Sequence, residues 1–409
     1  MRGRRRAWTA ALVTAVFAGL VTLPVLSVAA PAVAAPEVTA PARCPATAPA
    51  AAAVITGVPW AQERYAPQRL TPLADGRGIT VAVIDSGVDA RHPQLVGRVV
   101  PGTDLLDTGD GTVDCVSHGT AVASVIAAVP VAGVGFRGLA PAARILPVRV
   151  SEQLVLDGGA SGRTVPAAGL AQAIRYAVTH GATVLNLSVV LYRDDPAVRA
   201  AVADALAAGV TVVAAAGNDH AHGDPTPYPA AYDGVIGVGA IGPAGTRVPS
   251  SQVGSYVDIV APGADVTAAA RVQGHGVYEG TSFATPFVAA TAALVRQYWP
   301  GQSADAVATR ILATADPAPG GRWSAEYGYG VLNPYRAVTD RIAAGEPDQA
   351  LPLPVAAVDG DARTAADRRA TRQRMALRVA GGGGIAAALI LVVALVVPRG
   401  VRRRWRPGP

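Results

Sequence analysis

The chain has 409 residues, of which 51% are hydrophobic and 16% are charged; this excludes a chain that is disordered throughout and allows one large domain with appendages. The net charge of +6 comes from the two ends of the chain, because nine of the 35 basic residues are arginines within positions 2–6 and 399–406. It does not describe the residues between these ends, which we call the body. The other 26 basic residues stand against 29 acidic residues. That balance excludes a body that binds nucleic acid through a basic surface.

The first 35 residues have the pattern of a secretory signal peptide. Residues 1–6 are basic, residues 7–28 are apolar, and residues 29–35 supply small side chains for cleavage. An uncleaved anchor helix is the alternative, because the apolar run is long for a signal peptide. Residues 36–59 are rich in alanine and proline, and we interpret them as an N-terminal extension rather than a domain.

A body of alternating strands and helices is expected over residues 60–344. Short apolar runs predict strands that are buried on both faces, and longer runs with helical spacing predict helices. The alternation predicts an α/β domain in which a parallel sheet carries helices on both faces. Residues 101–117 and 151–165 are expected to be loops. In chain order the expected elements are a helix at 60–65, a strand at 79–85, a helix at 118–128, a strand at 144–150, a helix at 168–180, a strand at 183–188, a helix at 197–208, strands at 211–215, 235–238 and 257–260, and a helix at 283–299.

The C-terminal region carries a second long apolar run. Residues 345–378 are rich in proline, alanine and arginine and are expected to be a linker. Residues 379–397 contain no charge, and as a transmembrane helix they would be about 28 Å long, close to one hydrocarbon core. Arginines are equally numerous on both sides and do not orient this helix. If the signal peptide exports the body, residues 398–409 form a basic cytoplasmic tail, and the chain is a single-pass protein of the cell membrane.

The chain has two cysteines, Cys44 and Cys115. After export both would lie in an oxidising compartment, where a disulfide between them is expected. This bridge would close a long loop, which stabilises a fold by about 4 kcal/mol in the chain-entropy view. Two free thiols are the alternative, and two ligands so far apart in the sequence make a poor metal site.

Three polar residues stand in glycine-flanked turns at the ends of expected elements. Asp85 ends a strand, His118 begins a helix, and Ser282 stands where the long apolar helix begins. A serine at that place lies near free backbone N–H groups and the positive end of the helix dipole. Serine becomes a nucleophile when a histidine takes its proton and an acid holds that histidine in the right tautomer. The three residues therefore predict nucleophilic catalysis.

The segments around these residues resemble the motifs of the subtilisin-like serine proteases. The resemblance covers roughly residues 60–340 and implies a subtilisin-like three-layer α/β fold with a mainly parallel central sheet flanked by helices. It also implies a serine endopeptidase that hydrolyses proteins or peptides without a cofactor. The segments that carry it are VIDSGVD at 83–89, HGTAVA at 118–123, AAGN at 215–218, VDIVAPG at 257–263 and GTSFATP at 280–286.

The resemblance also implies a role for each residue of the site. Ser282 would attack the scissile carbonyl, His118 would carry the proton, and Asp85 would orient His118. The side chain of Asn218 and the backbone N–H of Ser282 would bind the oxyanion. Val189 and Val190 stand where many of these proteases have glycines, so we expect a narrow first specificity pocket and no broad degradative activity.

The order of the segments resembles one group within that family, the mycosins, which are membrane-anchored proteases of actinobacterial type VII secretion systems. In that group the N-terminal segment wraps the domain and is held by a disulfide, which agrees with Cys44 and Cys115. The resemblance implies that the chain processes secreted substrates and works with the membrane-embedded secretion complex. A general extracellular membrane-tethered protease and a mainly structural component of a secretion complex are the alternatives.

The other histidines and their acidic neighbours are expected to have structural roles. His92 and Asp89 belong to the loop after Asp85, and His180 is expected to cap a helix. No metal site is predicted, and no acidic cluster matches the family's strong calcium sites. A polar surface loop is expected to contain the remaining group, which consists of Asp219, His220, His222 and Asp224.

Overall fold

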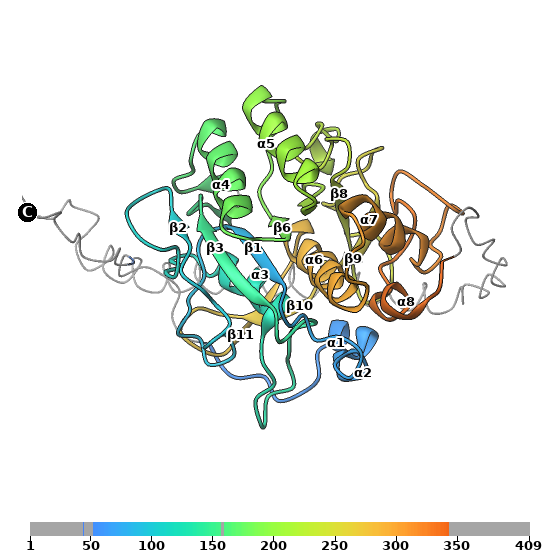
Figure 1. Ribbon diagram of the computed structural model, residues 1–409, viewed down its shortest axis with the longest axis horizontal. Helices are drawn as coiled ribbons and strands as arrows, with labels where there is room; N and C mark the ends of the chain where they lie inside the picture. The colour runs from blue at the N-terminus through green and yellow to red at the C-terminus, as the bar shows by residue number, and fades with distance from the viewer. Residues whose placement is uncertain (1–43, 45–51, 157–158, 343–409) are drawn as a thin grey trace, which may run out of the picture. The chain divides into compact units, whose positions relative to one another are not determined.

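The computed structural model describes residue 44, residues 52–156 and residues 159–342 (Figure 1). The expected signal peptide, linker, transmembrane helix at 379–397 and basic tail lie outside these residues, and the proposed segment boundaries stay predictions. Within the described part of the chain, no helix is long and apolar enough to cross a membrane.

Seven strands form one central sheet in which every neighbouring pair is parallel. The sheet has the strand order β2-β3-β1-β6-β7-β8-β9. This confirms the α/β architecture with a parallel sheet. The strands are β1 (Thr80–Asp85), β2 (Thr103–Asp104), β3 (Arg144–Arg149), β6 (Val184–Leu187), β7 (Thr211–Ala215), β8 (Ile236–Ile241) and β9 (Ile259–Pro262).

Helices cover both faces of this sheet and give a three-layer domain (Figure 1). Residues of α3 and α6 share one hydrophobic cluster with Val81 and Val83 of β1. Residues of α4 and α5 share a second cluster with Ala82 and Ile84 of the same strand. Alternate side chains of β1 therefore enter opposite cores, which is why its sequence is apolar without interruption. The four helices are α3 (His118–Ala127), α4 (Ala167–Thr179), α5 (Pro196–Ala207) and α6 (Thr281–Tyr298).

Several short elements surround the three layers, and most of them were not expected from the sequence. Two antiparallel hairpins are present, β4–β5 and β10–β11. The first hairpin and β2 correct the expectation of loops at 151–165 and 101–117. The helix at 60–65 is confirmed as α1. The short elements are α1 (Trp60–Tyr65), α2 (Pro67–Leu70), β4 (Leu154–Leu156), β5 (Gly159–Ser161), the 3-10 helix η1 (His220–His222), β10 (Val266–Ala269), β11 (His275–Tyr278), α7 (Ala304–Ala313) and α8 (Pro334–Thr339).

The N-terminal extension lies along the domain where the structure describes it. The N–H of Ala52 donates to the carbonyl of Gln273, and the N–H of His275 donates to the carbonyl of Ala53, both at 2.9 Å. The N–H of Ile55 donates to Nδ1 of His275 at 3.2 Å. These contacts place the extension beside β11, so it is fixed to the domain at this point.

Candidate active site

Asp85 lies at the carboxyl edge of the central strand β1. The residue is 2% exposed, and its carbonyl accepts the N–H of Val150 at 2.8 Å, which ties it to the neighbouring strand β3. Its Oδ1 accepts the N–H of Ser86 at 2.6 Å. Ligands of open parallel sheets bind at this edge, so the buried carboxyl group of Asp85 lies in the place where a site is expected.

His118 is the first residue of α3 and faces Asp85. Its Nδ1 lies 2.7 Å from Oδ1 of Asp85, and because a carboxylate only accepts, Nδ1 carries the hydrogen. The close approach depends on Gly119, since a Cβ at this residue would lie 2.1 Å from the carbonyl oxygen of Gly87. The Nε2 atom is left to act as a base. The His118 side chain is 27% exposed, so substrate can reach it.

Ser282 is the second residue of α6 and is half-buried. Its hydroxyl donates to the carbonyl of Ser188 at 3.4 Å, and the hydroxyl of Ser188 donates to the carbonyl of Ser282 at 3.1 Å. Among the described residues, no hydrogen bond joins Ser282 to His118. The next residue, Phe283, packs on the His118 ring with 4.9 Å between centroids. Ser282 therefore lies next to His118 in the chain's packing, although its hydroxyl hydrogen bond goes to Ser188.

Asn218 follows β7 and points to the start of α6. Its Oδ1 accepts the backbone N–H of Thr281 at 2.9 Å and the hydroxyl of Thr281 at 3.1 Å. Because the backbone N–H only donates, the oxygen of the amide must face Thr281, which leaves Nδ2 free to donate. Gly280 makes room for this contact: its φ is +135°, and a Cβ there would lie 3.2 Å from Nδ2 of Asn218.

Electrostatic interactions favour the charged form of His118. Burial lowers its pKa, but the charge and hydrogen bond of Asp85, with a further contribution from Asp114, outweigh burial and raise the pKa above its usual value. An anion held against an imidazole stabilises the imidazolium that forms when the ring takes a proton. The arrangement can therefore serve general-base chemistry.

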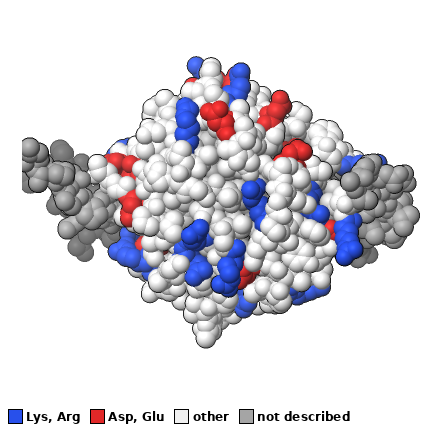
Figure 2. All heavy atoms as spheres, in the orientation of Figure 1, with Lys and Arg blue, Asp and Glu red and all other residues white. Residues whose placement is uncertain are grey.

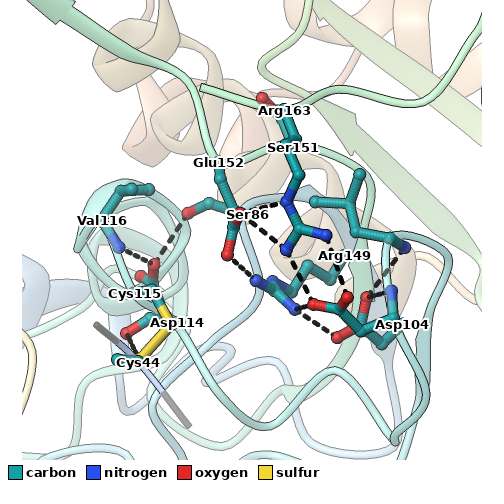
Figure 3. A network of polar contacts seen from close by, with 12 residues as sticks. Cys44, Ser86, Asp104, Asp114, Cys115, Val116, Arg149, Ser151, Glu152 and Arg163 are labelled. Atoms are coloured by element: carbon teal, nitrogen blue, oxygen red, sulfur yellow. Dashed lines mark hydrogen bonds and ion pairs between the residues drawn. A yellow bond between two sulfur atoms is a disulfide. The ribbon is translucent and has the colours of Figure 1, made fainter. Parts of the chain in front are cut away.

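The disulfide between Cys44 and Cys115 is present (Figure 3). It attaches the N-terminal extension three residues before His118. Asp114, the neighbour of Cys115, is buried beside the site. Asp114 was not predicted as a site residue, because its partners come from several separate segments and no local pattern marks it.

The remaining predicted residues lie outside this arrangement. Buried His92 donates from Nε2 to the carbonyl of Gly274 at 3.1 Å, and His180 donates from Nδ1 to the carbonyl of Tyr176 at 2.8 Å at the end of α4. Both have the structural roles expected of them. Asp89 is a loop residue, but it is buried and accepts the N–H of Val272 at 3.1 Å.

The polar group around η1 consists of two local histidine–aspartate contacts. His220 lies 2.9 Å from Asp224, and His222 pairs with Asp219. In the part of the chain that the structure describes, no group of three or more histidine, cysteine or acidic residues could hold a metal ion. On the face shown in Figure 2, arginine and acidic side chains are scattered over a mostly uncharged surface.

Comparison with known proteins identifies the family. The profile of the Subtilase family matches residues 76–330, so the chain belongs to this family of serine proteases. Thermitase of Thermoactinomyces vulgaris is 35% identical over 286 residues, which cover 68% of this chain and 97% of thermitase. A thermophilic serine proteinase of Bacillus sp. (strain AK1) is 38% identical over 263 residues, which cover 64% of this chain and 62% of that protein.

Within the subtilase family the chain is mycosin-like. Mycosin-4 of Mycobacterium tuberculosis (strain ATCC 25618 / H37Rv) is 35% identical over 376 residues, which cover 82% of this chain and 80% of mycosin-4. The crystal structure of MycP1 with the N-terminal propeptide removed has 32% identity and a TM-score of 0.61, covering 71% of this chain and 99% of MycP1.

Proposed function

We propose that the chain is a membrane-anchored serine endopeptidase that processes secreted substrates of a type VII secretion system and stabilises the membrane complex of that system. The observation that carries the proposal is the meeting of Asp85, His118, Ser282 and Asn218 at one edge of the sheet. The similarity to MycP1, a serine protease that is an essential component of the type VII (ESX-1) secretion system, supports the link to secretion; that structure has 34% identity to this chain and a TM-score of 0.61.

In the proposed mechanism Ser282 attacks the carbonyl carbon of the scissile peptide bond. Nε2 of His118 takes the hydroxyl proton during the attack and gives it to the leaving amine. Asp85 accepts the hydrogen of Nδ1, which keeps Nε2 unprotonated before the reaction and stabilises the imidazolium during it. Water then attacks the carbonyl carbon of the acyl-enzyme. Nε2 of His118 takes a proton from this water and gives it to the oxygen of Ser282 as the ester bond breaks, which releases the acid product and restores the serine.

The oxyanion of the tetrahedral intermediate is proposed to bind between two donors. One is the backbone N–H of Ser282, which lies in the first turn of α6 and has no partner within that helix. The other is Nδ2 of Asn218, whose direction follows from the two hydrogen bonds that Thr281 donates to Oδ1. Both donors are held in place before substrate arrives, which is what makes such groups effective.

Replacing Asn218 with alanine is expected to lower kcat by about 10²- to 10³-fold, because one preformed oxyanion donor is lost. KM should change little, since the donor acts on charge that develops only in the transition state. Steady-state kinetics on a peptide substrate measures both constants. Replacing the half-buried Asn333, which caps α8 far from the site, is the control. A variant at position 218 that keeps the wild-type kcat would remove this residue from the oxyanion site.

The activity is expected to fall in acid, at a pH set by His118. The general base works only as neutral imidazole, so kcat/KM should rise with pH through the pKa of His118 in the free enzyme. Since that pKa is raised, the midpoint of the acid limb should lie above the usual value of 6.5. A pH profile of kcat/KM checks this, and a midpoint at or below 6.5 would contradict the role given to Asp85.

The segment from Ser188 to Leu191, which lies beside Ser282, supports a narrow substrate specificity. Ser188 exchanges hydrogen bonds with Ser282, and the half-buried Val189 and Val190 follow directly. Leu191 then pairs with Tyr228 through hydrogen bonds of 2.7 and 2.8 Å, which fixes the segment. Two branched side chains on a fixed segment reduce the space next to the reacting carbonyl, in agreement with selective processing.

The enzyme proposal is tested by treating the full-length protein in membranes with a fluorophosphonate probe. We expect covalent labelling, with the adduct found on Ser282 by peptide mapping. Absence of labelling in a folded protein would contradict the proposal. Rapid digestion of casein would instead favour a general protease.

The secretion proposal needs a separate test in the native host. Deletion of the gene is expected to stop type VII secretion, and a wild-type copy is expected to restore it together with substrate cleavage. A Ser282→Ala copy should restore secretion without cleavage, because it keeps the fold that stabilises the complex. Type VII secretion that is unchanged after deletion would contradict this role.

A further inference from the structure

A second buried carboxylate, that of Asp114, accepts a hydrogen bond from the hydroxyl of Ser86 (Figure 3). Ser86 is the residue that follows Asp85, and its N–H donates to Oδ1 of Asp85. Asp114 is 1% exposed. It takes no part in the proton transfers described above. Its carboxylate nevertheless accepts five hydrogen bonds, which come from the N–H groups of Val116 at 3.0 Å, Ser117 at 2.9 Å and Thr120 at 2.8 Å, and from the hydroxyls of Ser86 at 2.9 Å and Thr120 at 2.6 Å.

The direction of the two hydroxyl hydrogen bonds follows from their other partners. The hydroxyl oxygen of Ser86 accepts the N–H of Gly119 at 2.9 Å, and that of Thr120 accepts the N–H of Asp89 at 2.9 Å. Because an N–H only donates, the hydrogen of each hydroxyl is left to point at Asp114. All five partners of Asp114 are therefore donors, and a proton on its carboxyl would replace one of these bonds. This pattern suits the ionised form.

These contacts connect the two elements that carry the catalytic pair. Ser86 is the residue after Asp85, at the end of β1. Ser117 directly precedes His118 at the N-cap position of α3, and Thr120 lies in the first turn of that helix. A single oxygen, Oδ1 of Asp114, accepts from both Ser86 and Ser117. The end of the strand and the start of the helix are thus held together next to the 2.7 Å hydrogen bond between Asp85 and His118.

We propose that Asp114 is a positioning residue for proteolysis, which holds Asp85 and His118 at hydrogen-bonding distance and adds a second negative charge beside the imidazolium. The inference rests on the proposed function, in which His118 is the general base. It assigns Asp114 no contact with substrate. Its effect on the reaction passes through Ser86, the first turn of α3 and the electrostatic field at His118.

The charged and titratable groups around Asp114 come from four segments. Asp85 on β1 and His118 on α3 face it from the catalytic side. Arg271, between β10 and β11, donates from Nε to the carbonyl of Asp114 at 3.2 Å, and the hydroxyl of Tyr278 on β11 lies 3.5 Å from that of Ser117. Burial raises the pKa of Asp114 above its usual value, and the negative charge of Asp85 adds to that rise. The hydrogen bonds from Thr120 and Val116 oppose it without cancelling it.

The test compares Asp114→Asn with wild type in the full-length protein. The amide of asparagine carries no charge. It also replaces one carboxylate oxygen, which accepts hydrogen bonds, with an NH₂ group, which would face the N–H and O–H donors around position 114. We expect kcat to fall about 10²-fold through misplacement of His118, with KM unchanged. We also expect the acid limb of kcat/KM to move to lower pH by about one unit, because a negative charge near the imidazolium is lost. A wild-type kcat and an unmoved acid limb would overturn the proposal.

Asp258→Asn is the matched control. Asp258 is also a carboxylate that accepts a backbone N–H, that of Gly237 at 2.8 Å, but it is half-buried and precedes β9 at the opposite edge of the sheet. We expect this variant to leave both kcat and the acid limb unchanged. An equal shift of the acid limb in both variants would overturn the local role of Asp114, since the shift would then come from the total charge.

If circular dichroism shows that Asp114→Asn does not fold, Ser86→Ala tests the positioning role of Asp114 instead. This change removes the bridging hydroxyl and keeps the charge of Asp114, so we expect a lower kcat with an unmoved acid limb. A wild-type kcat in Ser86→Ala would overturn the bridging role. Fluorophosphonate labelling distinguishes a failure of the proposed function from a failure of the role of Asp114. An unlabelled wild type contradicts the proposed function. A labelled wild type with an equally active Asp114→Asn variant contradicts only the role of Asp114.

Discussion

Replacing Ser282 with alanine is expected to abolish covalent labelling by a fluorophosphonate and to lower kcat by about 10⁶-fold, the usual effect of losing the nucleophile of a serine-protease triad. The reason lies in the geometry: the hydroxyl of Ser282 is the half-buried nucleophile next to His118, and Phe283 holds the two together. The alanine variant should fold normally, because the lost hydroxyl makes only one long hydrogen bond of 3.4 Å to Ser188.

The control for this variant is Ser303→Ala. Ser303 caps α7 by accepting the N–H of Ala306 at 3.2 Å, and it has no part in the site. We expect wild-type labelling and kcat in this control, with a loss of stability of about 1 kcal/mol from the missing cap. Labelling that persists in Ser282→Ala would mean that another residue is the nucleophile, and the mechanism proposed above would be wrong.

Replacing Arg149 with methionine is expected to lower the free energy of unfolding by about 3–5 kcal/mol, because it leaves a buried carboxylate without its cation. The Arg149 side chain is 1% exposed, and it pairs with Asp104, which is 3% exposed, and with Glu152 (Figure 3). A third carboxylate, Asp107, lies at 3.1 Å. Urea unfolding in a Ser282→Ala background measures the loss without self-digestion.

Two further variants separate the buried ion pair from the surface charges around it. Arg163 contacts Asp107 and Glu152 at 2.8 Å, but its side chain is 54% exposed, so Arg163→Met should cost less than about 1 kcal/mol. Adding Asp104→Asn to Arg149→Met should recover part of the lost stability, since the unpaired charge is removed. An Arg149→Met variant no less stable than Arg163→Met would show that the buried pair is not a major source of stability.

The central part of the fold was predictable because each element has a local signal. The continuous apolar run that becomes β1 buries every side chain, and the long run that becomes α6 buries all of its side chains from Phe283 to Val295. The ends of these elements are marked by Asp85-Ser86-Gly87 and Gly280. In contrast, β2 has two residues and β11 is only partly buried. Such elements have no periodicity of their own, and the neighbours that pair with them decide their formation.

In the site too, residues marked by a local sequence pattern were predictable, whereas contacts between residues distant in sequence were not. Asp85, His118, Ser282 and Asn218 stand in recognisable turns, so the sequence analysis could name them and propose their roles. The partners of the buried charges could not be found in this way. Arg149 meets Asp104 across 45 residues, and Ser86 meets Asp114 across 28, so only the packed structure brings these groups together.

The contact between the N-terminal extension and β11 has a consequence for the order in which the chain folds. Ile55 leaves the ribosome early, yet its hydrogen-bond partner His275 follows 220 residues later. This segment therefore cannot settle until most of the domain has been synthesised, and contacts of such large separation in sequence form slowly. The segment around Ile55, although it is synthesised early, is thus among the last parts of the domain to become ordered.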